Sequence, residues 1–182
     1  MSLSSTVFVF AIDLADADRQ IYDHLPLRVA RHPSESDEFL VARVLAYCLE
    51  FRHGIEFSRG LSDADEAPIA IRDATGVLQA WIDVGTPAPE RLHRAAKVAP
   101  RVVVYVHKDP RQWLRQLEAA PMHRRDALEL RVFDRGLIDG LVSRLERRMS
   151  FALAVADGEL FVSFADGTTV SGPVSSLRLG QA

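Results

Sequence analysis

Hydrophobic and polar residues alternate in two stretches near the start of the chain, and this period of two predicts strands at residues 6–14 and 25–30. Apolar residues then recur every three or four positions between Phe39 and Phe51, which predicts a helix of about four turns. A continuous apolar run at 101–107 is typical of a strand covered on both faces, as at the centre of an α/β sheet. The other predicted elements are a short strand at 55–61, a hairpin at 68–85 that turns at Asp73–Gly76, helices at 87–99, 110–120 and 136–149, and strands at 127–133 and within 151–174.

The start of the first helix carries a pattern of capping residues. Pro33 ends the preceding strand, and Ser34 is a suitable N-cap for the unpaired amide groups of the first turn. Asp37, three residues later, completes an acidic variant of the capping box. Glu35 and Glu38 are then expected in the first turn, where the helix dipole favours acidic residues whatever their function.

The chain has 182 residues and no linker, repeat or low-complexity segment. A single mixed α/β domain over 1–182 is therefore expected, with antiparallel strands at its N- and C-termini. No apolar run approaches the roughly 18 residues that cross a bilayer, and no basic segment precedes an apolar one at the start. We expect a cytoplasmic protein with no membrane partner. Cys48, the only cysteine, lies among apolar residues and is expected in the core.

Charged residues are unevenly distributed along the chain, whose net charge is −3. Residues 1–70 have 6 basic and 12 acidic side chains, whereas residues 71–148 have 15 basic and 10 acidic ones. This asymmetry fits an acidic cluster that holds a metal beside a basic surface that holds phosphate, and it equally fits plain solvated faces. Only two of the 22 basic residues are lysines, Lys97 and Lys108, so few residues could act where a chemistry needs a lysine.

The segment LQAWIDVG at 78–85 places a carboxylate near the end of a strand that otherwise has a buried pattern. Alternation puts Trp81 and Asp83 on one face of this strand and Ile82 on the other. An unpaired charge there would be costly, so Asp83 needs a partner: a metal ion, a base or a network of hydrogen-bond donors. A carboxylate at the end of a strand can also bond backbone amides of the next turn.

The order of the predicted elements and several short motifs resemble one known family. The motifs are ARHPSESDE (30–38), FSRGL (57–61), DADEAP (63–68) and WIDVGTP (81–87). Together they are similar to the YaeQ family, a set of small bacterial proteins placed within the PD-(D/E)XK nuclease superfamily, and the resemblance covers nearly the whole chain. It implies a restriction-endonuclease-like core with a mixed central sheet flanked by helices.

The superfamily resemblance further implies a phosphodiesterase that depends on Mg²⁺ or Mn²⁺ and acts on DNA or RNA. Oxygen ligands from acidic residues hold such an ion, which neutralises the scissile phosphate and activates water. The implied metal ligands are Glu35 and Glu38 on the first helix, Asp65 in the acidic loop and Asp83 on the strand. Glu38 and Asp83 are also implied to be catalytic.

One departure from the superfamily pattern concerns the catalytic basic residue. Gly85 stands where the D/E-x-K motif has its lysine, but superfamily members also carry the basic group on the following helix. The resemblance then implies Arg94, or Lys97 almost one turn later, in this role. Arginine can neutralise phosphate but is a poor proton acceptor, because it does not deprotonate at working pH.

A second departure lies in the acidic loop. Pro68 stands where many relatives have the last carboxylate of the loop. Either Asp65 or Glu66 could take its place through a shift of register, or a ligand is missing from this chain.

Two other functions stay open on the sequence. The chain could be an inactive nuclease-fold protein that binds nucleic acid or a protein through its basic region at 91–125, which includes Arg111, Arg115 and the HRR run at 123–125. It could also be a regulatory interaction protein with no nucleic-acid role, which the net negative charge mildly favours. The oligomeric state is not indicated by any of these patterns.

Overall fold

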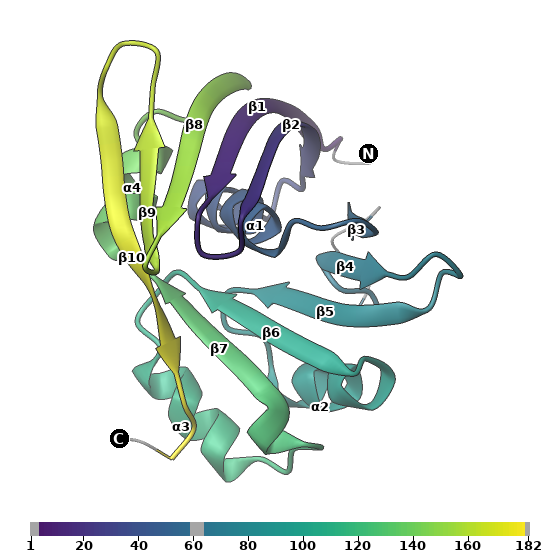
Figure 1. The fold of residues 1–182 in the computed structure, drawn as a ribbon. Coiled ribbons are helices and arrows are strands. Elements are labelled where there is room, and N and C mark those ends of the chain that lie inside the picture. Colours follow the sequence, from purple (N-terminus) through teal and green to yellow (C-terminus); the bar gives the residue numbers. More distant parts are fainter. Residues whose placement is uncertain (1–3, 59–63, 181–182) are drawn as a thin grey trace. The chain divides into compact units, whose positions relative to one another are not determined.

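The computed structural model describes residues 4–58 and 64–180, and in these ranges it contains four α-helices and ten strands (Figure 1). The expected mixed α/β class is confirmed. The chain divides into two compact units: unit 1 comprises Met1–Val41 and Phe133–Ser175, and unit 2 comprises Ala42–Val132 and Ser176–Ala182. The single domain over 1–182 stays a prediction. Within the described ranges, no helix combines the length and apolar character needed to span a membrane.

Unit 1 is built from both ends of the chain. Its strands are β1 (Thr6–Asp16), β2 (Ile21–Arg31), β8 (Arg148–Ala156), β9 (Glu159–Ser163) and most of β10 (Thr169–Leu177), and its own helix is α4 (Arg135–Val142). The strands lie in the order β2-β1-β8-β9-β10. β1 is antiparallel to β2, and β9 is antiparallel to both β8 and β10, as expected for the termini. The sequence did not indicate that β1 also pairs with β8 in parallel.

One face of the unit 1 sheet forms its core. Alternate residues of β1, such as Phe10 and Ile12, are buried, and the residues between them are more exposed. Helix α4 belongs to this buried side, since a Cβ added to Gly140 would lie 2.5 Å from Val170 of β10. Asp134 caps α4, because its carboxylate accepts a 3.1 Å hydrogen bond from the amide of Leu137.

Unit 2 contains the middle of the chain and the last part of helix α1 (Asp37–Glu50). Its other elements are β3 (Ile55–Phe57), β4 (Ile69–Arg72), β5 (Leu78–Val84), α2 (Pro89–Val98), β6 (Arg101–Val106), α3 (Arg111–Ala119), the short 3₁₀ helix η1 (Arg125–Ala127) and β7 (Leu128–Phe133). The strand order is β7-β6-β5-β4-β3. β5, β6 and β7 are parallel, whereas β3 and β4 are antiparallel additions.

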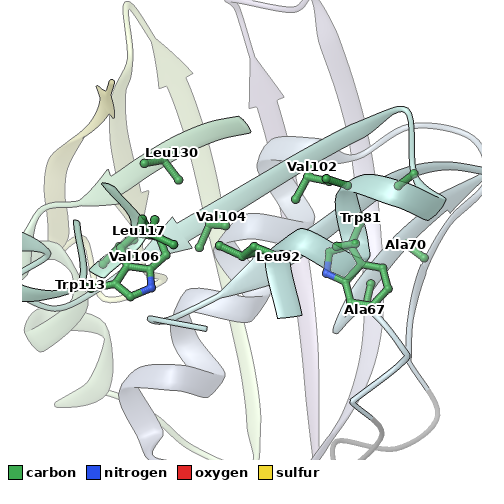
Figure 2. Close-up of a cluster of buried hydrophobic side chains, with 13 residues drawn as sticks. Ala67, Ala70, Trp81, Leu92, Val102, Val104, Val106, Trp113, Leu117 and Leu130 are labelled. Carbon is green, nitrogen blue, oxygen red and sulfur yellow. The ribbon is translucent and has the colours of Figure 1, made fainter. Parts of the chain in front are cut away.

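The two faces of the unit 2 sheet are covered by different helices. Val102 and Val104 of β6 face the core cluster that also contains Leu92 of α2 and Leu117 of α3 (Figure 2). The intervening residue positions face the other way, where Tyr105 donates a hydrogen bond to Glu50 at the end of α1. β6 is therefore covered on both faces, as its continuous apolar run predicted.

The start of α1 differs from the prediction. The helix begins at Asp37, and Ser36 caps it by accepting a 3.1 Å bond from the amide of Phe39. Ser34 instead bonds the ring of His32, and Glu35 lies before the helix, where its carboxylate accepts a bond from the His32 amide. Both serines suit an N-cap, but the local turn at His32 engages the first of them. Glu38 is in the first turn, as expected.

Helix α4 is shorter than the sequence predicted, whereas Cys48 is buried as predicted. Helix α4 spans Arg135–Val142, so the prediction of a helix over 136–149 was wrong in its second half. There the chain turns, because Ser143 bonds back to the carbonyl of Gly140, and then enters β8 at Arg148. Cys48 is fully buried, as expected.

Two glycines with the same backbone angle give a test of the packing in unit 2. Gly54 has φ +85° and a Cβ added to it would lie 1.9 Å from the Arg72 carbonyl oxygen, whereas Gly76 has φ +86° and open space around it. Gly76→Ala should lower the free energy of unfolding by about 1 kcal/mol, the strain of a left-handed alanine. Gly54→Ala should lower it by about 2 kcal/mol more, because the backbone must move.

Urea unfolding followed by circular dichroism measures both variants. Equal losses for the two alanines would contradict the close approach of Gly54 to β4.

Candidate functional site

Asp83 lies at the end of β5, on the face of the unit 2 sheet that α2 covers. It is 3% exposed, and Trp81, two residues earlier on the same face, is 4% exposed. Sequence alternation predicted this shared face. The strand ends immediately afterwards, because Gly85 takes a φ of +85° while its amide bonds the carbonyl of Tyr105. A side chain at this position would be strained, so the chain geometry itself disfavours a lysine here.

The sequence predicted a metal ion, a base or a network of hydrogen-bond donors as the partner of Asp83. The structure shows a basic side chain and two further donors. Arg91 Nε donates to Oδ2 of Asp83 at 2.7 Å, and Trp81 Nε1 donates to the same oxygen at 3.0 Å. The backbone amide of Val84 lies 3.1 Å from Oδ1 and donates to it. A buried carboxylate needs such compensation, and here its charge has a partner and each of its two oxygens accepts at least one hydrogen bond.

Arg91 joins three segments of unit 2. Its guanidinium also donates to the carbonyls of Ala64 (2.9 Å) and Glu66 (2.8 Å), and its Cζ lies 5.2 Å from the centre of the Trp81 ring. One side chain thus ties α2, β5 and the end of the acidic loop together. The rigid fork of arginine permits this, whereas a lysine has no comparable geometry.

The remaining loop and helix residues are placed less tightly. The Asp65 carboxylate lies 3.8 Å from Arg94, and both side chains are more than half exposed, so this is a weak surface pair. Lys97 is exposed in the last turn of α2. It lies six residues beyond Arg91, which is about 9 Å further along the helix and about 120° around it. Of the predicted basic residues, Arg94 is therefore nearer to the acidic loop than Lys97.

Glu35 and Glu38 belong to unit 1, whereas Asp65 and Asp83 belong to unit 2. The structure thus leaves the joint metal site of these four acids a prediction. Among the residues that the structure describes, no group of three or more His, Cys, Asp or Glu side chains is positioned to hold a metal ion. Arg59 and Asp63, in the motifs at 57–61 and 63–68, lie outside the described residues.

Sequence reasoning did not identify Arg91 as the partner of Asp83. A signal was present, because a basic residue in the first turn of a helix opposes the helix dipole and is disfavoured unless something compensates it. Arg91 occupies such a position in α2, next to Glu90. The position of Arg91 in the first turn of a helix therefore indicates that it has an acidic partner. The separation of eight residues from Asp83 does not by itself indicate which one.

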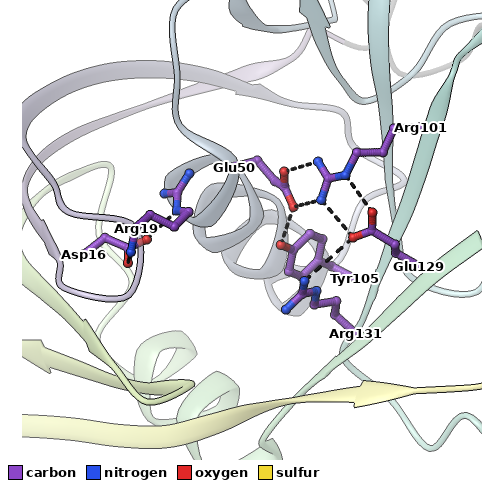
Figure 3. A network of polar contacts seen from close by, with 7 residues as sticks. All are labelled: Asp16, Arg19, Glu50, Arg101, Tyr105, Glu129 and Arg131. Carbon is purple, nitrogen blue, oxygen red and sulfur yellow. Dashed lines mark hydrogen bonds and ion pairs between the residues drawn. The ribbon is translucent and has the colours of Figure 1, made fainter.

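A second polar network lies on the opposite face of the same sheet (Figure 3). Arg101 of β6 donates to Glu50 of α1 at 2.6 Å and, through Nε, to Glu129 of β7 at 2.8 Å. Tyr105 donates to Glu50 at 2.7 Å, and burial together with the Glu50 charge raises the pKa of the Tyr105 hydroxyl well above 10.0. Arg131 lies 3.7 Å from Glu129. This network fastens the end of α1 to the strands β6 and β7.

The basic HRR run also has a structural role. Arg124 donates to the carbonyls of Ala96 and Ala99 at the end of α2. Arg125 donates to the carbonyls of Glu118 and Ala120 at the end of α3. These are the unpaired carbonyls that a helix leaves at its C-terminus, where a cation is also favoured by the dipole. Consecutive arginines therefore cap two different helices.

Known proteins resemble this chain over more than nine-tenths of its length. A family model described as "YaeQ protein" matches residues 1–172. An uncharacterised YaeQ protein from Salmonella typhi is 28% identical over 167 residues, which cover 91% of this chain and 92% of the relative. The crystal structure of YaeQ from Xanthomonas axonopodis pv. citri has a TM-score of 0.85 and 32% identity, covering 96% of this chain and 99% of the other. The YaeQ structure from Pseudomonas syringae also has a TM-score of 0.85, at 25% identity, over 95% of this chain and 96% of that one.

The geometry around Arg91 predicts that it stabilises unit 2 through shape as well as charge. Arg91→Lys keeps the charge but loses the fork, so at least one carbonyl or the Asp83 carboxylate loses its donor. We expect the free energy of unfolding to fall by about 1–3 kcal/mol. Arg94→Lys, three residues away on the same helix and exposed, should change it by less than about 0.5 kcal/mol.

Chemical unfolding of the two lysine variants beside the wild type measures this difference. If both variants unfold with the wild-type midpoint, Arg91 does not hold the three segments together.

The Arg101 network predicts a pH dependence of stability. The hydrogen bond from Arg101 lowers the pKa of the Glu129 carboxyl below its ordinary value of 4.5. This stabilisation is therefore present above about pH 4.5 and disappears as the pH falls through the lower pKa of the folded state. Glu129→Gln should reduce stability at pH 7 by about 1 kcal/mol or less, because the pair is partly exposed, and the difference should shrink in acid.

Urea midpoints between pH 7 and about pH 3 measure this effect, with Glu146→Gln as a control for the loss of one exposed carboxylate. A difference that grows on acidification would contradict the assigned ion pair.

Proposed function

Because this chain belongs to the YaeQ family, we propose that it has a nuclease-like core, as its resemblance to the PD-(D/E)XK superfamily implies, and that it binds nucleic acid without cleaving it. The observation that carries this proposal is the ion pair between Asp83 and Arg91. The carboxylate that the resemblance assigns to a metal ion already has a cation beside it. The proposed partner is the phosphate backbone of DNA or RNA.

The order of elements in unit 2 supports the nuclease-like core. Helix α1 is followed by the strands β3, β4 and β5, then by helix α2 and the buried strand β6. This is the order of helix, hairpin, helix and buried strand on which the resemblance rests. Asp83 stands at the end of the strand that the resemblance assigns to the D/E-x-K motif, and α2 is the helix that would carry a displaced basic residue.

The geometry of Asp83 supports binding without cleavage. A metal ion at this carboxylate would have to displace Arg91, whose guanidinium also holds the carbonyls of Ala64 and Glu66. Breaking a largely buried ion pair by removing one partner is strongly unfavourable, typically by about 3–5 kcal/mol. The arrangement therefore favours a structural role for Asp83.

A basic layer formed by α2, α3 and their connections provides the binding surface. Residues 87–127 contain nine basic and four acidic side chains. Arg94, Lys97 and Arg115 are exposed on the two helices. Arg124 and Arg125 bond neutral carbonyls, so they keep a net positive charge on this layer while capping the helices. Clustered basic residues of this kind bind phosphate backbones without reading sequence.

A second candidate is the phosphodiesterase that depends on Mg²⁺ or Mn²⁺. The observation that favours it is that Arg91 holds the chain at Ala64 and Glu66 next to Asp83, which brings Asp65 towards the same end of α2. The described residues do not fit a bound ion as they stand, because the oxygens of Asp83 are already bonded and no three acids converge.

Binding without cleavage is tested with fluorescently labelled single-stranded DNA, duplex DNA and RNA of equal length. We expect binding that weakens steeply between about 50 and 200 mM salt, as counterion release requires. Arg94→Glu with Lys97→Glu should weaken binding at least about tenfold, whereas Arg135→Glu with Arg147→Glu, two exposed residues of unit 1, should change it little. No cleavage is expected in Mg²⁺ or Mn²⁺.

Two results would overturn the proposal. Absence of salt-dependent binding to all three nucleic acids would remove the binding function. Metal-dependent cleavage that Asp83→Asn abolishes, together with calorimetric binding of Mn²⁺ to the wild type and not to the folded variant, would replace it with the second candidate. Arg91→Gln distinguishes the two roles further, because it should gain no cleavage if Asp83 is structural.

A further inference from the structure

The outer face of the unit 1 sheet is partly or fully exposed to solvent and largely apolar. We define this outer face as Val7, Val9, Ala11, Asp13 and Ala15 of β1 together with the residues in register with them on β2, β8 and β9. These positions alternate with the buried residues of the core face. Every outer-face residue on β2 and β8 is exposed in the structure.

Small side chains flanked by aromatic ones make this face flat. Tyr22, Ala15, Ala154 and Phe161 form one row across four strands, since their Cα positions are paired in register. Tyr22 is 66% exposed and Phe161 is 39% exposed. The alanines between them would let another flat surface approach closely, and the two aromatic rings would be buried on contact. An exposed apolar patch with polar neighbours is typical of a protein interface.

The charges on this face are separated along the strands. Val9 is paired with Arg28 on one side and with Arg148 on the other, and neither arginine forms an ion pair with another described residue. Asp13, whose side chain is 75% exposed, lies four residues further along β1, or about 14 Å away. Its one ionisable neighbour in register is His24, whose ring nitrogen Nδ1 lies 2.6 Å from the carboxylate.

We infer that the outer face binds a second copy of this chain. A two-fold axis lying in the interface, perpendicular to β1 and passing Ala11, places Asp13 of each copy opposite Val9 of the other. Asp13 then lies between Arg28 and Arg148 of the second copy, and symmetry repeats this contact. Ala11 is the midpoint because Val9 and Asp13 are each two residues from it. A self-complementary patch of this kind is what a symmetric dimer requires.

The charge pattern selects a second copy over a polyanion. The two arginines would attract a phosphate backbone, but Asp13 in the same face would repel it. A second copy provides an acidic partner for the two arginines and a basic partner for Asp13, at the same distance along β1. The polar residues Ser163 and Ser171 lie at the β9 and β10 side of the face, where a polar rim is expected.

The area of the outer face determines how strongly two copies are expected to associate. Four strands span about 15 Å and the rows from Val7 to Ala15 span about 27 Å, so each copy contributes about 400 Å². The total of about 800 Å² is below the roughly 1,200 Å² of stable specific interfaces and in the range of weak ones, so the Kd should be in the micromolar range or above.

Sedimentation velocity on the full chain, over protein concentrations from micromolar to millimolar, tests this dimer. Asp13→Arg alone, and Arg28→Glu with Arg148→Glu, should each weaken self-association at least about tenfold. The triple variant with all three changes restores opposite charges and should return association to within about threefold of the wild type. Arg135→Glu with Arg178→Glu matches the charge change elsewhere on the chain and should leave association unchanged.

The charge-swap variants also guard against misfolding, because a variant that has merely unfolded cannot be rescued by two more substitutions. A wild type that is monomeric at all concentrations would overturn the inference. A dimer unaffected by these charges, or a triple variant that stays monomeric while folded by circular dichroism, would also overturn it.

Discussion

The arrangement of the candidate site depends on one guanidinium group. Arg91 bonds the carboxylate of Asp83 on β5 and two carbonyls at the end of the acidic loop, and it does so from the first turn of α2. Because its donors are fixed in one plane, the strand end, the loop and the helix are fixed relative to one another. Trp81, beneath the guanidinium, both bonds Asp83 and packs into the core cluster, so the polar site and the apolar core share a residue.

Arginine has the same role elsewhere in unit 2. Arg101 lies between Glu50 and Glu129, and Arg124 and Arg125 close the ends of α2 and α3. Each of these side chains satisfies several oxygen atoms that would otherwise lack donors, which lysine does less well. The scarcity of lysine in the chain fits this use. A basic composition in this region therefore reflects internal bonding as much as an external ligand.

Local signals were sufficient for much of the fold. The hairpin turn at Asp73–Gly76 could be predicted because Asp73 bonds the amides of Thr75 and Val77, only a few residues away. The alternation that placed Trp81 and Asp83 on one face is equally local. The Asp83–Arg91 pair could not be predicted with the same security, because it depends on how α2 returns to β5. The N-cap of α1 was predicted at Ser34 but is Ser36, although both residues are local. Two serines near the helix start suit an N-cap, and the hydrogen bond between Ser34 and His32 leaves Ser36 to cap the helix.

The parallel pair of β1 and β8 was also beyond local patterns, since Val9 is paired with Arg148 from the other end of the chain. This pairing has a consequence for synthesis on the ribosome. The β1–β2 hairpin is made before unit 2 but is marginally stable alone, and its neighbour β8 emerges only after nearly all of unit 2. The strands of unit 2 are close together in the sequence, so unit 2 can fold before the hairpin has its neighbour β8. The hairpin is thus made before unit 2 but completed after it, and during that interval its β1 edge is open to other chains.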